Sequence, residues 1–202
     1  MANFEIDNTT LLIASQNEHK IAEFRQKLKD NNVLSLNDIG YFDEIEENGT
    51  TFEENSLIKA KTISEYLQTI GINIPVIADD AGLCVNALNG APGVYSARYN
   101  GNSHDVQGNR DKLLKELEGV TDRSAYFCCA LVKYYPDGHY VCALGKTFGH
   151  ITLNEIGDKS FGYDCLFYSD DLGKTFGEST MEEKNKVSHR GRAIEELLRI
   201  DK

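Results

Sequence analysis

The pattern of apolar and polar positions divides the first half of the chain into short strands and amphipathic helices. Apolar runs predict buried strands at residues 9–14 and 75–78, and the second strand is expected to stop at the two acids that follow it. Apolar residues at helical spacing predict helices over residues 18–30 and about 52–70, and a capping-box sequence precedes the longer one.

The second half of the chain contains a clear hairpin and two further helices. Residues 124–135 and 139–151 predict two strands joined by a turn at Pro136-Asp137-Gly138. Ser103 is expected to cap a helix that ends at Leu117, and Ser188 is expected to cap the last helix. The apolar side chains expected to face inward from these two helices are Val106, Leu113, Leu114, Leu117, Ala193, Ile194, Leu197 and Leu198.

Three glycine-containing stretches fit neither the helical nor the strand period. Residues 89–98 are too irregular for either element and predict an ordered loop. Gly-Lys-Thr occurs at residues 145–147 and 173–175, but the earlier glycine of a phosphate-binding P-loop is Tyr140 in one copy and Tyr168 in the other. We therefore interpret both copies as turns.

Length, composition and net charge limit the kinds of molecule that the protein could bind and where it could be located. The 202 residues suffice for one domain with a substantial core, and no apolar run is long enough to cross a bilayer. A net charge of -11 argues against binding to a nucleic-acid polymer. The N-terminal residues lack the features of a signal peptide, so we expect a cytoplasmic protein. The five cysteines are odd in number and show no C-x-x-C spacing, which favours reduced, mostly buried thiols.

The acids Asp79 and Asp80, which follow a predicted strand, are the first candidate site. Paired carboxylates at the end of a strand can hold a divalent cation or accept a proton. An Asp-Asp pair before a glycine is also ordinary turn chemistry. On this stretch alone, both interpretations stay open.

A candidate anion site follows the first predicted strand. Asn17 can cap the helix that begins at Glu18, with the Ser15 hydroxyl and the Lys20 ammonium close to the free amides of its first turn. Helix N-terminal amides with a nearby cation bind phosphate. A simple capped helix with a solvated lysine is the alternative.

Two segments near the C-terminal end could bind a planar base and a small polyanion. Residues 161–164 place two aromatic rings around a glycine and beside an acid, which can form a stacking platform for a base, although such rings more often belong to a core. Residues 184–192 are basic in an acidic chain and could attract a small polyanion. Solvated cations are the alternative, yet cations oppose the dipole at a helix N-terminus.

Six segments, taken in order, resemble the inosine/xanthosine triphosphate pyrophosphatases, also called the Ham1-like family. The resemblance extends from Leu12 to Leu198. The segments are Ser15-x-Asn17-x-x-Lys20, Glu46-Glu47-x-Gly49-x-x-Phe52-x-Glu54-Asn55, Ala78-Asp79-Asp80-x-Gly82-Leu83, Gly90-Ala91-Pro92-Gly93-Val94-Tyr95-Ser96-Ala97-Arg98-Tyr99, Phe161-Gly162-Tyr163-Asp164 and Glu183-Lys184-Asn185-x-x-Ser188-His189-Arg190.

The resemblance implies a fold and an activity. The expected fold is α/β, with a mixed, twisted β-sheet flanked by helices in two lobes and a central nucleotide-binding cleft. Residues 1–202 would form a single nucleoside-triphosphate pyrophosphatase domain in a homodimer. The expected reaction converts ITP, dITP, XTP and dXTP to the monophosphate and pyrophosphate.

The resemblance also implies roles for individual residues. Glu47 and Asp80 match the ligands of Mg2+, Asp80 also matches the proton acceptor for the attacking water, and Asp79 supports it. Ala81 stands where many members have Ser or Thr, so only its backbone could contact the substrate. The other residues that match substrate contacts are Ser15, Asn17, Lys20 and Lys59 at the triphosphate, Phe161, Gly162, Tyr163 and Asp164 around the base, and Lys184, His189 and Arg190 on the base and sugar side.

Two other functions remain as alternatives. A Maf-like pyrophosphatase of other modified nucleotides is disfavoured by Ser188-His189-Arg190 and by Phe161-Gly162-Tyr163-Asp164. A nucleotide-binding regulator without turnover is disfavoured by the intact acids Glu47, Asp79 and Asp80. A purely structural module would leave the basic segment of an acidic chain without a role.

Overall fold

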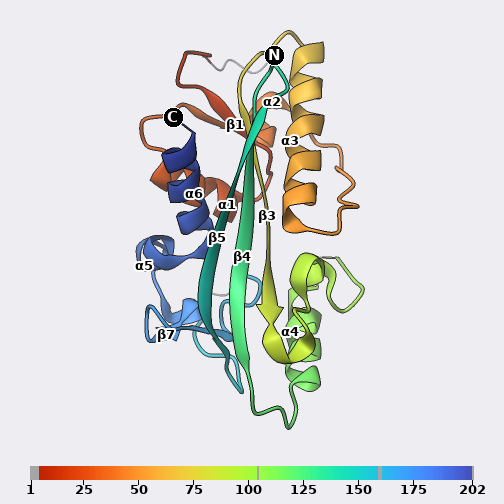
Figure 1. Cartoon of the computed structure of the whole chain (residues 1–202), viewed down its shortest axis with the longest axis vertical. Coiled ribbons are helices and arrows are strands. Elements are labelled where there is room, and N and C mark those ends of the chain that lie inside the picture. The colour runs from red at the N-terminus through yellow and green to blue at the C-terminus, as the bar shows by residue number, and fades with distance from the viewer. Residues whose placement is uncertain (1–4, 104, 159–160, 202) are drawn as a thin grey trace. The chain divides into compact units, whose positions relative to one another are not determined.

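The chain forms an open, mixed sheet of seven strands in the computed structural model, which describes residues 5–103, 105–158 and 161–201 (Figure 1). The strand order is β2-β1-β3-β4-β5-β6-β7. β1 pairs in parallel with β2 and β3, whereas β6 pairs antiparallel with β5 and β7. The strands are β1 (Leu11–Ile13), β2 (Val33–Ser35), β3 (Val76–Val85), β4 (Ser124–Tyr134), β5 (Tyr140–Ile151), β6 (Phe167–Ser169) and β7 (Lys174–Thr175).

Helices flank this sheet, as expected for the α/β class. The α-helices are α1 (Glu18–Lys27), α2 (Leu36–Ile39), α3 (Phe52–Thr69), α4 (Val106–Glu116), α5 (Met181–Val187) and α6 (His189–Ile200). Short 3-10 helices are η1 (Asn86–Leu88), η2 (Gly93–Arg98) and η3 (Phe176–Glu178). In the described part of the chain, no helix has the length and apolarity needed to cross a membrane.

The chain divides into two compact units, each built from separate segments. Unit 1 comprises Met1–Asp80, Ala130–Leu144 and Ala193–Lys202. Unit 2 comprises Ala81–Cys129 and Gly145–Arg192. Consequently β3, β4, β5 and α6 each contribute residues to both units.

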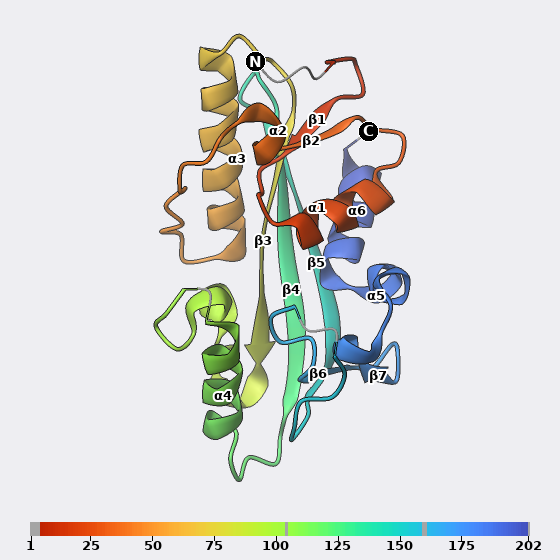
Figure 2. The same ribbon diagram turned by 180° about the vertical axis from the view of Figure 1, so that it is seen from behind.

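The core of unit 1 contains the apolar face of α3. The Thr51 hydroxyl accepts a hydrogen bond from the Glu54 N–H at 3.1 Å, which confirms the predicted capping box at the start of this helix. Ile63 and Leu67 of α3 are fully buried in one cluster with Val76 of β3. Full burial of such a side chain contributes about 1.5–3 kcal/mol. On another side of this unit, α1 lies beside α6, where Lys27 and Glu195 pair at 2.5 Å (Figures 1 and 2).

The core of unit 2 is rich in aromatic rings. Phe127 of β4 meets Phe167 of β6 edge to face, with ring centroids 4.8 Å apart, and Phe176 packs on both. Leu113 of α4 and Leu117, which follows this helix, complete the same cluster. Edge-to-face pairs add about 0.5–1.5 kcal/mol beyond the buried area. These rings pack β6, which follows the 161–166 segment, against β4.

The prediction that the second strand stops at its two acids is wrong. β3 continues through both aspartates to Val85, and Leu83 and Val85 are fully buried. Asp79 and Asp80 are tolerated inside this strand because each carboxylate has a nearby polar partner. The turn interpretation of the Asp-Asp pair is therefore excluded.

Several boundaries also differ from the predictions. Asp105, not Ser103, caps α4 by accepting a hydrogen bond from the Gly108 N–H at 2.9 Å. This cap leaves Val106 in the first turn, where it is 39% exposed, and Leu198 on α6 is 49% exposed, so neither faces inward. Helix α1 ends at Lys27, because Leu28 already has non-helical backbone angles.

Two stretches interpreted as loop or turn have regular structure in part. Residues 93–98 of the predicted loop form η2. Residues 145–147 lie within β5, so the first Gly-Lys-Thr copy is a strand and not a turn. In the second copy Gly173 has a φ of 65°, which fits a turn, and the two following residues form β7. All five cysteines are free, and only Cys142 among them is not buried, as the composition predicted.

Candidate functional site

The loop after β1 in unit 1 has the predicted cap geometry. The Asn17 side-chain oxygen accepts hydrogen bonds from the backbone N–H groups of His19 and Lys20 at 3.0 and 3.3 Å. The Ser15 hydroxyl in turn accepts one from the Asn17 N–H at 3.1 Å. The helix start is therefore preorganised directly after the strand, with the positive end of the helix dipole at this loop.

Strand register brings Lys20 to Asp79. Because Ile13 of β1 lies opposite Ile77 of β3, Asp79 follows only two residues beyond the point where β1 ends. The Lys20 ammonium lies 3.2 and 3.1 Å from the two oxygens of this buried carboxylate. The predicted phosphate-binding lysine thus pairs with an acid of the protein in this structure.

The neighbouring acid, Asp80, has a different set of partners. Its Oδ2 accepts a hydrogen bond from the Asn55 side-chain amide of α3 at 2.9 Å. Successive strand residues project to opposite faces, so Asp79 meets α1 while Asp80 meets α3. The two acids are therefore not equivalent, even though they are adjacent in the chain.

Electrostatic coupling joins Asp80 to Lys59 and Glu47. Burial raises the pKa of the Asp80 carboxyl above its usual value, the Lys59 charge and the Asn55 hydrogen bond oppose this, and the Glu47 charge adds to it. Lys59 and Glu47 pair at 2.8 Å, with the Lys59 side chain largely buried. These groups therefore act on one another within a single polar cluster on the α3 side of β3.

The carboxylates of this cluster suit a divalent cation that is shared with a polyphosphate. Within residues 5–103, 105–158 and 161–201, no group of three or more His, Cys, Asp or Glu side chains could hold a metal by itself. Magnesium, however, is usually bound through one or two carboxylates, with substrate phosphates and water as the other ligands. Asp80 and Glu47 are carboxylates of this type, and they interact electrostatically within the cluster.

Unit 2 contains a second polar cluster, around the segment that begins at Phe161. Lys184 of α5 pairs with Asp164 at 2.6 Å, and both side chains are buried. The Lys184 nitrogen also lies 5.8 Å from the centroid of the Phe161 ring, which is 37% exposed. Tyr163 is buried, donates a hydrogen bond from its hydroxyl to the Ser96 carbonyl at 2.8 Å, and has a raised pKa because of its burial. Tyr163 therefore anchors this segment, while the Phe161 ring retains an accessible surface.

Backbone contacts fix the position of Asp164 and the start of α5. The Gly177 N–H donates to the Asp164 carbonyl at 2.9 Å. At the start of α5, Glu183 accepts a hydrogen bond from the Thr180 N–H, and this bond with the Lys174 ion pair lowers the pKa of Glu183 to about 2. Lys184 follows directly, so the cap orients the helix that carries it.

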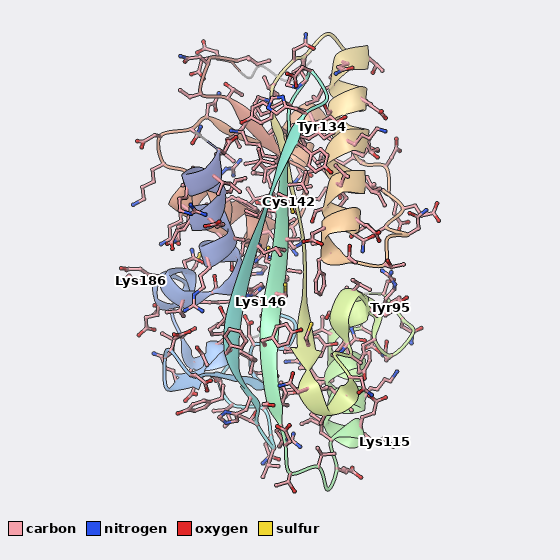
Figure 3. The ribbon with its side chains drawn as sticks, in the orientation of Figure 1. Tyr95, Lys115, Tyr134, Cys142, Lys146 and Lys186 are labelled. Carbon is pink, nitrogen blue, oxygen red and sulfur yellow. The ribbon has the colours of Figure 1, made fainter. Side chains whose placement is uncertain are left out.

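The basic segment of residues 184–192 separates into buried and surface cations. His189 and Arg190 are buried, and the His189 ring stacks on Phe127 with centroids 4.7 Å apart. By contrast, Lys186 pairs with Glu182 at the surface, and its side chain extends from the outer side of α5 (Figure 3). The segment therefore contains both buried donors and surface cations. The charge pattern of the sequence alone could not distinguish these two kinds of side chain.

The predicted site residues fall into two sets. The first, in unit 1, consists of Ser15, Asn17, Lys20, Glu47, Lys59, Asp79 and Asp80. The second, in unit 2, consists of Ala81, Phe161, Gly162, Tyr163, Asp164, Lys184, His189 and Arg190.

Sequence reasoning assigned no role to Asn55 or Phe127. Asn55 lies one helical turn before Lys59, a spacing that places both on one face of α3 and could have indicated a shared role. Phe127 carries no such signal, because its stacking on His189 depends on the fold of unit 2.

Comparisons with known proteins place the chain among related sequences and structures. A family model described as Ham1 family matches residues 11–200. A dITP/XTP pyrophosphatase of Clostridium perfringens is 48% identical over 191 residues, covering 92% of this chain and 94% of the relative. A dITP/XTP pyrophosphatase of Bacillus licheniformis is also 48% identical over 191 residues, covering 93% and 95%. The Staphylococcus aureus Ham1 protein superposes with a TM-score of 0.84 at 39% identity, covering 96% of this chain and 100% of that structure.

Proposed function

We propose, because the chain belongs to the Ham1 family, that it hydrolyses ITP, dITP, XTP and dXTP to the nucleoside monophosphate and pyrophosphate. The relatives named dITP/XTP pyrophosphatase match more than nine-tenths of the chain. The observation that carries the proposal is the set of charged contacts in unit 1, where β3 places Asp79 beside Lys20 of α1 on one face and Asp80 near Lys59 and Glu47 on the other. A protein that only bound nucleotides would have little need of these acids.

The proposed reaction is an attack of water on the α-phosphorus. A bond forms between the water oxygen and the α-phosphorus, and the bond from the α-phosphorus to the bridging oxygen breaks, so that pyrophosphate leaves. Asp80 accepts the proton of the water, while Asn55 donates a hydrogen bond to one of its oxygens. Lys20 and Lys59 contact the charged phosphates once these replace Asp79 and Glu47 as their partners.

Magnesium is the proposed cation, and Asp80 and Glu47 are its proposed ligands. When bound, it would neutralise polyphosphate charge that otherwise repels the attacking oxygen. The two carboxylates match the ligand type that magnesium prefers. Asp79 has a supporting role, because it holds Lys20 beside the strand.

The proposed base site consists of the unit 2 cluster. Phe161 would stack on the base, and Asp164 with Lys184 would hold the segment around it. Hypoxanthine and xanthine present a 6-keto acceptor, whereas adenine presents a 6-amino donor. Donors from the buried residues His189 and Arg190 would pair with the keto oxygen and lose that partner with adenine, which costs about 1–3 kcal/mol for each unpaired group.

The assembly and location are part of the same proposal. We propose that residues 1–202 act as one catalytic domain, in which unit 1 binds the triphosphate and unit 2 binds the base of the same nucleotide. A homodimer is the proposed assembly. The five free cysteines suit a reducing compartment and support a cytoplasmic location.

Product analysis tests the proposed function. Pyrophosphate and orthophosphate release would be measured from dITP, XTP, dGTP and ATP with Mg2+. We expect turnover of dITP and XTP far above that of dGTP and ATP, with pyrophosphate as the direct product. Equal rates on all four nucleotides, or direct release of orthophosphate, would contradict the proposal.

The same assay tests the role of Asp80. Asp80→Asn keeps the size of the side chain but removes the proton acceptor and a metal ligand, so kcat should fall by at least about 100-fold. Glu65→Gln is a matched control, since Glu65 is an exposed acid of unit 1 that pairs only loosely with Lys61, at 3.9 Å. Full activity of Asp80→Asn would overturn the assignment of this residue even if the substrate preference were confirmed.

A further inference from the structure

Asn55 connects two parts of the proposed metal site that are distant in sequence. It lies in the first turn of α3, is 1% exposed, and uses both ends of its side-chain amide. Its oxygen accepts a hydrogen bond from the Gly49 N–H at 2.8 Å, and its nitrogen donates one to Asp80 at 2.9 Å. One buried side chain thus links the loop that carries Glu47 to the strand that carries Asp80.

The surroundings of Gly49 show how closely this connection is packed. A Cβ atom at Gly49 would lie 2.6 Å from the Asn55 side-chain oxygen and 3.0 Å from the Asn55 backbone nitrogen. This Cβ would also lie 2.7 Å from the Glu54 Cβ, so any larger residue at this position would displace the Asn55 amide or the helix turn that carries it. The capping box of α3, formed by Thr51 and Glu54, fixes the helix turn from which Asn55 projects.

This geometry would act on the reaction by orienting the Asp80 carboxylate. The amide occupies Oδ2 of Asp80. A hydrogen bond on one oxygen restricts rotation of the carboxylate and so helps to fix its orientation toward a cation. At the other end of the Asn55 amide, the hydrogen bond from the Gly49 N–H holds the backbone two residues after Glu47.

We propose that Asn55 is a positioning residue, which sets the distance and orientation of the Glu47 loop and the Asp80 carboxylate for the divalent cation. The inference rests on the proposed function, because it takes these two acids as metal ligands. Hydrogen-bond partners of metal ligands typically change metal affinity by about 10- to 100-fold when they are removed. Asn55 touches neither the cation nor the substrate and acts only through the acids.

The adjacent residue Ser56 provides a matched comparison. Ser56 is fully buried in the same helix turn, and its hydroxyl donates to the Ala130 carbonyl at 2.8 Å. Removing that hydroxyl also breaks one buried hydrogen bond in unit 1, but this bond does not reach the acids. Asn55→Leu and Ser56→Ala therefore separate positioning of the acids from general loss of stability.

The test is Mn2+ binding to the protein in the presence of a non-hydrolysable dITP analogue, followed by electron paramagnetic resonance. We expect Asn55→Leu to weaken Mn2+ binding by about 10- to 100-fold and to lower kcat on dITP at saturating cation more than it raises KM. Gly49→Ala, which keeps Asn55 but displaces its amide, should weaken Mn2+ binding in the same direction. Ser56→Ala should lower the melting temperature and leave Mn2+ binding within about twofold of wild type.

Two results would overturn the inference. The first is an Mn2+ affinity of Asn55→Leu and Gly49→Ala no weaker than that of Ser56→Ala. The second is wild-type protein that binds no Mn2+ when that dITP analogue is present, since Asn55 would then have no metal ligands to position. Failure of the proposed function is a separate outcome, seen as absent pyrophosphate release from dITP and XTP, and it would not alter the Mn2+ titration.

Discussion

At the scale of single residues, the Asp164–Lys184 ion pair is a contact of unit 2 beside the proposed base-binding ring, Phe161. Both side chains are buried and 2.6 Å apart. Removing one partner of such a pair leaves an uncompensated charge in a low-dielectric environment, which costs about 3–5 kcal/mol. The proposed base-binding segment therefore depends on this pair for its position as well as for its charge.

A double-mutant cycle tests this dependence. We expect Lys184→Met to lower the free energy of unfolding by about 3–5 kcal/mol, measured by urea denaturation at pH 7. Adding Asp164→Asn should restore part of that loss, because the buried charge that Lys184 neutralised is then removed as well. Strictly additive effects of the two substitutions would show that the pair contributes nothing beyond its separate side chains.

Sequence patterns predicted the roles of single residues well where these roles depend only on local backbone geometry. Asn17 caps α1 as expected, because a cap depends only on the backbone within three residues. The pairing of Lys20 with Asp79 was not predicted, because it depends on the register of β1 against β3. The contact of Asn55 with Asp80 was missed because α3 and β3 meet only in the folded unit.

At the scale of elements, a close backbone approach at Gly177 fixes the segment that precedes β6. A Cβ at Gly177 would lie 2.7 Å from the Ile156 carbonyl oxygen and 2.9 Å from Cys165 Cα, both of which are backbone atoms. Neither atom can move without shifting the backbone of the loop that contains it. The Gly177 N–H also holds the Asp164 carbonyl, so this glycine controls the position of the proposed base site.

Gly177→Ala should therefore affect both stability and substrate binding. We expect the free energy of unfolding to fall by about 3 kcal/mol or more, and the KM for dITP to rise. Gly119→Ala is the matched control in the same unit, because its φ of 72° is strained for alanine but no atom lies within 4 Å of the added Cβ. The control should lose about 1–2 kcal/mol and keep its KM. An unchanged KM in Gly177→Ala would contradict the link to Asp164.

Element types were predicted better than element ends. The hairpin of β4 and β5 has its turn at the predicted residues, since Gly138 donates to the Tyr135 carbonyl. The end of β3 was misjudged because two acids in a row usually stop a strand, and only tertiary partners allow them to remain inside it. Val106 and Leu198 were assigned to the core by spacing, but the packing of their helices leaves both exposed.

At the scale of the whole molecule, the C-terminal segment is tied into unit 1 by Asp201. Its carboxylate accepts hydrogen bonds from Lys133 at 2.6 Å and from the Tyr135 hydroxyl at 2.5 Å. Burial opposes ionisation of Asp201, but these contacts outweigh it and lower its pKa. The contact joins parts of the chain that are 66 and 68 residues apart in sequence.

The lowered pKa predicts a defined pH dependence. A group with a lowered folded-state pKa stabilises the fold above its unfolded pKa, about 3.9 for Asp, and loses this contribution as the pH falls through the folded value. Asp201→Asn should therefore cost about 1.5–3 kcal/mol at pH 7, and the difference from wild type should shrink below about pH 4. Asp171→Asn, which breaks an exposed pair with Arg192, should cost no more than about 1 kcal/mol. A pH-independent difference would contradict the assignment.

The lysine pairs of unit 1 have a consequence for the order of ligand binding. In the free protein, Lys20 and Lys59 already have internal counter-ions in Asp79 and Glu47. A polyphosphate that takes over Lys59 removes the positive charge paired with Glu47, and a divalent cation held by Glu47 and Asp80 would replace that charge. Nucleotide and cation should therefore bind cooperatively, each raising the affinity for the other by the same factor. The site would thus select the metal-nucleotide complex over either component alone.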